Sequence, residues 1–292
     1  MKPSRKQSKP DTPRSDNRTL LQKFAAAPHI FWSALFIIIP LIFVAYYAFT
    51  KDVDGRFTFT LENVAAFFTP AYLKVFWRSV KLALIATAIT LLIGYPMAYC
   101  MSKTKPKTQK ILVMLIMLPM WMNFLIRTYS WISILANTGL INKFLGHFGI
   151  GPLQLINTPG AVILGMVYDF IPYMILPIYT AMSKIDNSLL EAASDLGSNS
   201  WSRIRRVIMP LSLPGVISGI TMVFVPSVST FYISQKLGGN KTLLIGDAIE
   251  YLFNTGPHYY NIASTLSLIL MVLILISTLI MNKFGDDAEV VV

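Results

Sequence analysis

The most conspicuous chemical group in this chain is one acid with apolar surroundings. Asp169 stands inside a hydrophobic run, with Tyr168, Phe170 and Tyr173 close by in the sequence. A charged carboxylate at membrane depth is costly and usually faces a pathway or a charged partner. Carboxylates and aromatic faces also attract organic cations. We expect this cluster to line a route for a cation, or Asp169 to pair with Arg127 or with a partner subunit.

The other reactive residue types form no recognisable catalytic group. The three histidines, His29, His147 and His258, are far apart and lack metal-ligand spacing. Cys100 is the single cysteine, so no intrachain disulfide can form. A hydrolase would need a nucleophile, a base and a positioned partner, and no such arrangement is found. The sequence therefore predicts no catalytic residue and no metal site.

The composition identifies the elements that must position these residues. The chain has 292 residues, of which 54% are hydrophobic and 13% charged, against roughly 25% charged in soluble domains. Its mean hydropathy is +0.57, and the apolar residues form long runs. The net charge of +11 lies mainly in an N-terminal tail and in loops, which argues against a nucleic-acid partner.

Six apolar runs are long enough to cross a bilayer, since a spanning helix needs about 20 residues. We expect an all-α fold, a polytopic membrane helical bundle of about six transmembrane helices. Prolines interrupt all but the last run, either as ordinary kinks or as hinges of a pathway. The expected spans are 29–50, 79–101, 111–136, 159–182, 208–233 and 262–281.

Basic residues orient these spans. If the N-terminus is cytosolic, the cytosolic segments hold sixteen of the 25 Lys and Arg residues, as the positive-inside rule requires. Both termini are then cytosolic. We expect a disordered basic tail at 1–28, a transmembrane domain at 29–281 and a short tail at 282–292.

Two outer segments complete this arrangement. The segment 51–76 is expected to be a loop with a short amphipathic helix. Asp247 and Glu250 lie in the outer segment 235–261, where they would receive a cation, dock a partner or simply be solvated.

A polar loop at 184–210 interrupts the apolar pattern between the fourth and fifth expected spans. Ser188 and Glu191 have capping-box spacing, and Asp186 is a rival N-cap. Gly197 suits the left-handed residue that ends a helix. Ser198 or Ser200 would cap a second short helix that ends before Pro210. Leu189, Leu190 and Ala193 would form one apolar stripe on the first helix.

The spacing in this loop resembles the EAA loop of ABC-importer permease subunits of the binding-protein-dependent type. Glu191, Ala192 and Ala193 are followed by Gly197 and then by Met209-Pro210. The resemblance implies that the loop is a coupling helix docking into a separate ATPase subunit, with Leu189 and Leu190 on the same helix. It implies two ATPase subunits, a second homologous permease and an extracellular substrate-binding protein as partners in the cell membrane.

Two further segments look like the spermidine/putrescine group of these permeases. They are Pro119–Trp131 and Pro226–Lys241. The resemblance implies polyamine import by alternating access. Thiamine, iron or sulfate as cargo, or a channel or membrane-bound enzyme, are the alternatives. On the fifth span, Phe224, Phe231 and Tyr232 are candidate gate or contact residues. No phosphate-binding loop is recognisable, so no cofactor is expected on this chain, and ATP and Mg belong to the partner ATPase.

Overall fold

The structure is a computed structural model that describes residues 28–53, 56–239 and 242–290 of the chain. The expected tail at 1–28 lies outside these residues except for Pro28. Short π-helical or 3-10 turns carry the letter η. The elements are η1 (Ala34–Ile38), α2 (Ile39–Ala48), β1 (Thr50–Val53), β2 (Arg56–Phe59), α3 (Glu62–Phe67), α4 (Pro70–Ser102), α5 (Pro106–Trp121), α6 (Phe124–Leu135), α7 (Leu140–His147), α8 (Pro159–Ser183), α9 (Asn187–Asp195), α10 (Ser200–Arg203), η2 (Ile204–Ile208), α11 (Met209–Ser229), η3 (Ser234–Gly238), α12 (Ile245–Thr255), η5 (Pro257–Tyr259) and α13 (Tyr260–Val290).

The chain forms two compact units, which divide between Tyr46 and Tyr47. In the first unit, a helix begins at Pro28 and passes through the wide turn η1 into α2. This turn ends two residues before Pro40. A proline has no N–H to donate and crowds the preceding turn, so a widened turn at that point accommodates it.

Among the described residues, five helices are long and apolar enough to cross a membrane, and a bent pair supplies a sixth candidate. The helical class and the number of spans are therefore as predicted. The second span begins at Pro70 rather than near 79, because proline suits the first position of a helix. The five single helices are Pro28–Ala48, Pro70–Ser102, Pro159–Ser183, Ser200–Ser229 and Pro257–Phe284.

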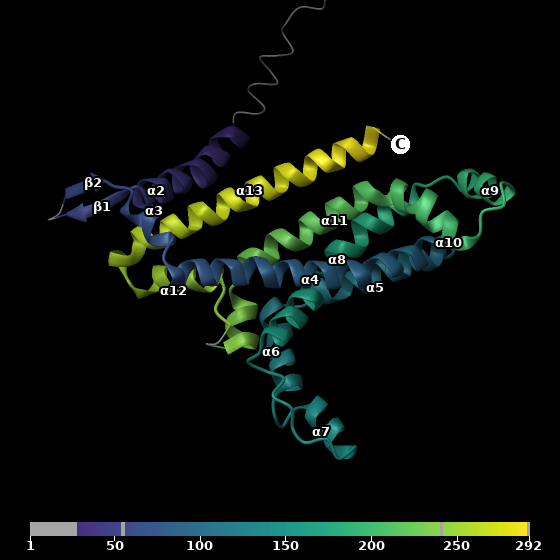
Figure 1. Ribbon diagram of the computed structural model, residues 1–292, viewed down its shortest axis with the longest axis horizontal. Helices are drawn as coiled ribbons and strands as arrows, with labels where there is room; N and C mark the ends of the chain where they lie inside the picture. Colours follow the sequence, from purple (N-terminus) through teal and green to yellow (C-terminus); the bar gives the residue numbers. More distant parts are fainter. Residues whose placement is uncertain (1–27, 54–55, 240–241, 291–292) are drawn as a thin grey trace, which may run out of the picture. The chain divides into compact units, whose positions relative to one another are not determined.

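The expected third span, 111–136, is not one continuous helix. It consists of α5 and α6, and the chain bends by 87° between Pro106–Trp121 and Phe124–His147, a segment that contains α6 and α7. Met122 is extended between them, and the Asn123 side chain accepts a hydrogen bond from the Leu125 N–H at 2.8 Å. This N-cap starts a new helix, so the apolar run turns sharply there. Figure 1 shows α6 and α7 projecting away from the long helices.

The expected fifth span, 208–233, is also different. The helix is continuous from Ser200 through the wide turn η2 to Ser229, and Pro210 does not end it. The Met209 N–H donates to the Ile204 carbonyl across η2. As in the first helix, the widened turn ends two residues before a proline, so the chain passes it without a break.

The long helices α4, α8 and α11 pack against one another (Figure 1). Glycines lie at these contacts. A Cβ atom on Gly94 of α4 would lie 3.0 Å from the Met174 side chain on α8. On α11, a Cβ on Gly215 would lie 2.6 Å from the Ala181 Cβ, also on α8. Small residues allow this close backbone approach, which stabilises helix pairs where lipid supplies no hydrophobic driving force.

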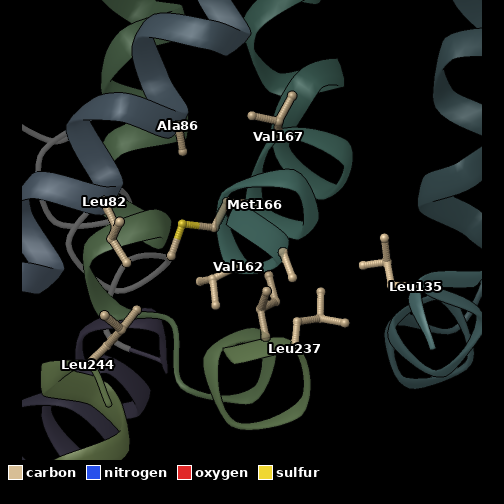
Figure 2. Close-up of a cluster of buried hydrophobic side chains, with 10 residues drawn as sticks. Leu82, Ala86, Leu135, Val162, Met166, Val167, Leu237 and Leu244 are labelled. Atoms are coloured by element: carbon tan, nitrogen blue, oxygen red, sulfur yellow. The ribbon is translucent and has the colours of Figure 1, made fainter. Parts of the chain in front are cut away.

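A buried apolar cluster connects five parts of the second unit. Figure 2 shows residues from α4, α6, α8 and η3, together with Leu244 at the start of α12, pointing toward one another. Met166 and Val162 of α8 lie at its centre and are fully buried. The cluster fixes α6 and η3 against α8, and both carry polar residues described below. Its labelled members are Leu82, Ala86, Leu135, Val162, Met166, Val167, Leu237 and Leu244.

The segment expected as a loop with a short helix, 51–76, is more ordered than predicted. It begins with the antiparallel hairpin β1–β2, in which Thr50 pairs with Phe59. The helix α3 follows, and the Asn63 amide donates to the carbonyls of Ala48 and Thr50. Asn261 of α13 donates to the Tyr47 carbonyl at 2.9 Å. These two amides satisfy backbone carbonyls at the strand entry, which anchors the hairpin.

Candidate functional site

The polar loop between α8 and α11 is a short capped helix. Asp186 is the N-cap of α9, because its side chain accepts from the Ser188 N–H at 2.9 Å. This hydrogen bond lowers the pKa of Asp186 below its usual value. The predicted capping box with Ser188 as the cap is therefore wrong, and the rival Asp186 is correct. An acid at this position also interacts well with the helix dipole.

Gly197 ends α9 as the sequence predicted. Its φ is +77°. The Gly197 N–H donates to the Ser194 carbonyl at 2.8 Å, and the Ser198 N–H donates to the Ala193 carbonyl at 3.1 Å. This pair of bonds is the Schellman motif, which needs a left-handed residue at the position of the glycine.

The next helix has a different cap from the one expected. Asn199 accepts from the Ser202 N–H at 2.8 Å, so neither Ser198 nor Ser200 is the N-cap. Arg203 then ties the two helices together, since it donates to the Ser194 hydroxyl at 2.8 Å and to the Ser200 hydroxyl at 3.2 Å.

The helix α9 presents polar and apolar groups to its surroundings. None of its residues is buried. Glu191, Ala192 and Leu189 are exposed, whereas Leu190 and Ala193 are half-buried, so the expected apolar stripe is divided between two faces. Just beyond the helix, Leu196 is 89% exposed. Trp201, at 68% exposed, lies on α10.

A polar cavity of about 330 Å³ lies beneath α9. Leu190 lines it from α9, and the turn between α4 and α5 lines it from the other side. Tyr179 of α8 donates to the Gln109 side chain at 3.1 Å, and that amide in turn donates to the Ser102 and Thr104 carbonyls. The loop therefore rests on a hydrogen-bonded platform formed by α4, α5 and α8.

The buried acid Asp169 pairs with Arg127. The Arg127 Nη1 lies 3.1 Å from the Asp169 Oδ1, and the two side chains are only 10% and 6% exposed. The sequence left two interpretations of Asp169, a cation route or a charged partner, and the structure places the partner Arg127 within reach. The pair joins α6 to α8 just after the sharp bend. The Arg127 Nε, the Arg127 Nη1 and the Asp169 Oδ1 have no well-aligned hydrogen bond.

The aromatic residues predicted around Asp169 divide among several neighbours. The Tyr168 ring meets the Trp131 ring of α6 edge-on, with centroids 5.3 Å apart. The ring centroids of Phe170 and Tyr173 lie 6.4 Å apart, and Tyr173 is partly exposed. All three residues come from α8, so the aromatic groups follow the same helix as the acid.

The other candidate pathway residues are not brought together. Phe224 is buried in a second apolar cluster with residues of α12 and α13. Phe231 is partly exposed and lines a shallow apolar pocket with residues of α12 and α13. Tyr232 lies instead beside α6, where its ring is 5.3 Å from that of Phe124.

Sequence reasoning missed one polar group and misplaced another. Lys236 on η3 places its ammonium over the rings of Tyr129 and Tyr232. The spacing of Tyr232 and Lys236, four residues apart, was a signal that both could share one helical face. The partner Tyr129 comes from α6, and only the tertiary structure shows that it lies close.

Asp247 is the group that sequence reasoning placed in the wrong environment. It was expected on a solvated surface or as a receiver of ligand, but it is 1% exposed. Its carboxylate accepts from the Ser234 hydroxyl at 2.9 Å and from the Leu244 N–H at 2.7 Å. Burial raises the pKa of Asp247 to about 6, although both hydrogen bonds oppose this shift. The carboxylate thus fastens η3 to the start of α12.

The described residues contain no group of three or more His, Cys, Asp or Glu side chains that could hold a metal ion.

Comparison with known proteins gives the family. The family described as binding-protein-dependent transport system inner membrane component matches residues 90–287. The spermidine/putrescine transport system permease protein PotB of Haemophilus influenzae is 44% identical over 237 residues, covering 80% of this chain and 83% of the relative. The PotB protein of Salmonella typhimurium is 35% identical and covers 94% of this chain and 99% of the relative.

Solved structures share the fold. A bacterial ABC transporter involved in the import of the acidic polysaccharide alginate matches with a TM-score of 0.73 at 19% identity, covering 92% of this chain and 96% of that one. The MetNI methionine ABC transporter in an inward-facing conformation matches with a TM-score of 0.55 at 17% identity, covering 74% and 95%. The chain therefore belongs to the binding-protein-dependent transport system inner membrane components, and it is a multi-pass permease of the cytoplasmic membrane.

Proposed function

We propose that this chain is the permease subunit of an ATP-driven importer for polyamines, and that α9 is its docking element for the ATPase. The exposed apolar residues at α9 carry the docking proposal. Leu196 and Trp201 project from a loop that is otherwise polar. Neighbouring exposed apolar residues mark a protein or membrane contact, and in a cytosolic loop we infer a protein contact. Glu191, Ala192 and Leu189 lie on the same exposed part of the loop.

The proposed assembly contains two ATPase subunits, a second homologous permease and an extracellular binding protein. ATP and Mg bind to the ATPase subunits, and this chain performs no hydrolysis. Closure of the ATPases would move α9, and the platform beneath α9 would pass this motion to α4, α5 and α8. In this arrangement both termini and the loop 184–210 are cytosolic, in agreement with the excess of basic residues there.

The polyamine cargo is supported by two kinds of observation. The relatives with the highest identities given above are named spermidine/putrescine permeases. The buried carboxylate of Asp169, with Tyr168, Phe170 and Tyr173 on the same helix, supplies groups that attract organic cations. We propose that these residues and Tyr232 border the route. Phe231 is a candidate contact at its outer end, and Phe224 supports the route from the core.

Uptake by the reconstituted importer tests the cargo. The complex of permeases, ATPases and binding protein is placed in liposomes, and ATP-dependent uptake of labelled spermidine and putrescine is measured. Unlabelled thiamine, sulfate and iron serve as competitors. We expect both polyamines, and none of these solutes, to compete. Equal competition by any of the three would reject polyamines as the specific cargo.

Copurification tests the docking role separately. Replacing the exposed Leu196 by Glu should reduce the amount of ATPase that copurifies with the permease, because a charge is introduced at an apolar contact. Phe148→Glu on the loop after α7 is the matched control, since Phe148 is similarly exposed and far along the chain from α9. Equal recovery of ATPase with both variants would reject docking at α9.

A further inference from the structure

The ammonium group of Lys236 lies against the faces of two tyrosines from different elements. Its Nζ is 5.7 Å from the centroid of the Tyr129 ring and 5.6 Å from that of Tyr232. Both distances fall within the range of about 6 Å at which a ring attracts a cation. We call Tyr129 and Tyr232 the tyrosine clamp. No ion pair among the described residues involves Lys236, so its charge is held by the two rings rather than by a carboxylate.

The clamp is built on well-anchored elements. Tyr129 belongs to α6, which the cap at Asn123 starts at a fixed point. The Tyr232 ring packs on Phe124 of the same helix. Next to it, η3 is fastened by the hydrogen bond from Ser234 to Asp247 and by the burial of Leu237 in the core (Figure 2). The Tyr232 ring is therefore positioned by packing on Phe124, and the position of Tyr129 follows from the fixed start of its helix.

The clamp is also left partly uncovered by the rest of the described chain. Tyr129 is 52% exposed, and Tyr232 and Lys236 are half-buried. A ligand can approach the rings if the lysine side chain moves aside, and four rotatable carbons give it that freedom.

The group that fills the clamp indicates which ligand it accepts. A lysine side chain is a four-carbon chain that ends in a primary ammonium. Putrescine is a four-carbon chain with an ammonium at each end, and spermidine carries the same aminobutyl arm. The clamp thus already holds a covalently attached copy of one end of the proposed cargo.

We propose that the tyrosine clamp is a binding site for a primary alkylammonium end of the cargo, and that Lys236 is an internal competitor which the cargo displaces. The proposal rests on the polyamine function proposed above. While the clamp is empty of cargo, Lys236 covers the two ring faces. When an aminobutyl end arrives, it replaces the Lys236 ammonium, which swings into water.

Removal of the competitor should strengthen binding. The apparent dissociation constant equals the intrinsic constant divided by the fraction of sites that the competitor leaves free. At a partly exposed site, the attraction between the ring faces and a cation favours the state with Lys236 bound over the free state. The affinity of the clamp for the cargo is then about threefold to sixfold weaker than it would be without Lys236. Lys236→Met keeps an unbranched side chain of nearly the same length and removes the charge. It should lower the dissociation constant by that factor.

The test is equilibrium binding of labelled spermidine to the purified complex without its binding protein, alongside uptake by the complete importer. We expect Lys236→Met to bind about threefold to sixfold more tightly and Lys236→Arg, which keeps a cation on the rings, to bind like the wild type. The control Lys143→Met removes an exposed lysine of α7 and should change nothing. Combining Lys236→Met with Tyr232→Leu should abolish the gain.

The double variant separates the clamp from simple charge repulsion. If the gain persisted without the Tyr232 ring, Lys236 would only repel the cargo, and the clamp would be rejected. Unchanged or weaker binding by Lys236→Met would reject it as well. The clamp would also be rejected if neither the wild-type nor the Lys236→Met complex bound spermidine although the complete importer still took it up. If uptake and binding are both absent, the polyamine function fails, and this inference fails with it.

Discussion

Removing one partner of the Arg127–Asp169 pair should be far more damaging than removing both. The two side chains are 10% and 6% exposed and approach to 3.1 Å. In Asp169→Asn the guanidinium stays buried without a counter-charge. In Arg127→Leu the carboxyl is left alone, but it can become neutral by binding a proton, whereas a guanidinium cannot lose one. We therefore expect Asp169→Asn to be the more destabilising single variant.

The size of the effect follows from the burial of the pair. Removing one member of a buried pair destabilises proteins by about 3–5 kcal/mol, whereas replacing both by apolar residues is often neutral. At roughly 2–4 °C per kcal/mol, Asp169→Asn should lower the apparent unfolding temperature by about 6 °C or more. The double variant Arg127→Leu with Asp169→Leu should return close to the wild-type value.

Thermal unfolding of the purified complex measures these shifts. The exposed pair Lys51–Glu62, at 2.6 Å and with side chains 52% and 69% exposed, provides the control. Glu62→Gln should change stability by less than about 1 kcal/mol. If Asp169→Asn shifted the transition no more than Glu62→Gln, or if the two single effects simply added in the double variant, the pair would not be the buried unit described here.

Measuring uptake by the same variants distinguishes the role of the pair in stability from a role in transport. A stable double variant that has lost uptake would show that transport needs the charged pair itself and not only its contribution to stability. If Asp169→Asn left uptake kinetics unchanged in an intact complex, the proposed pathway role of Asp169 would be rejected.

Three other substitutions test separate parts of the structure. Gly197→Ala places a side chain at a φ of +77° in open space, so it should weaken the turn by about 1 kcal/mol and reduce ATPase copurification, while Gly197→Asn is better tolerated; equal behaviour of the two variants would contradict this. Gly215→Val brings a Cβ within 2.6 Å of the Ala181 Cβ and should destabilise the complex by about 1–3 kcal/mol more than Gly146→Val, whose Cβ meets nothing within 4 Å. Because the pKa of Asp247 is raised to about 6, the folded state binds its proton more tightly than the unfolded state, so its contribution is fully present below about pH 4 and is lost as the pH rises through 6. The stability should therefore fall by at most about 3 kcal/mol over that pH range, and the unfolding temperature should fall with it. Asp247→Asn should make the unfolding temperature less dependent on pH. A wild-type unfolding temperature that is already independent of pH would show that the carboxylate stays charged.

The sequence predicts the long helices well, because about 20 consecutive apolar residues leave few alternatives in a membrane protein. Its errors lie where one side chain decides the geometry. The Asn123 cap divides an apolar run that looks continuous, and a widened turn carries the chain past Pro210 where a proline predicts an end. Both effects depend on single hydrogen bonds, to which hydropathy is insensitive.

In the candidate site too, features set by neighbouring residues could be predicted, whereas features set by tertiary contacts could not. Gly197 was predictable because a left-handed residue after a helix is a local requirement. The choice between Asp186 and Ser188 as the cap was not, since both have the right chemistry within three residues. The Arg127–Asp169 pair was one of two alternatives in the sequence. The tyrosine clamp could not be predicted, because Tyr129 and Lys236 lie on separate elements that only the folded core brings together.

The unbroken helix from Ser200 to Ser229 has a mechanical consequence. Thirty residues of helix measure about 45 Å at 1.5 Å per residue. One end carries the exposed Trp201 beside α9, and the other leads directly to Tyr232 and Lys236. Such a rod acts as a lever: a tilt of about 10° at one end would displace the opposite end by roughly 8 Å. The wide turn η2 lies four residues from the Ser200 end of this helix. If motion enters at that end, as proposed above, we expect η2 to bend first, so stiffening it should change how far the Ser229 end moves.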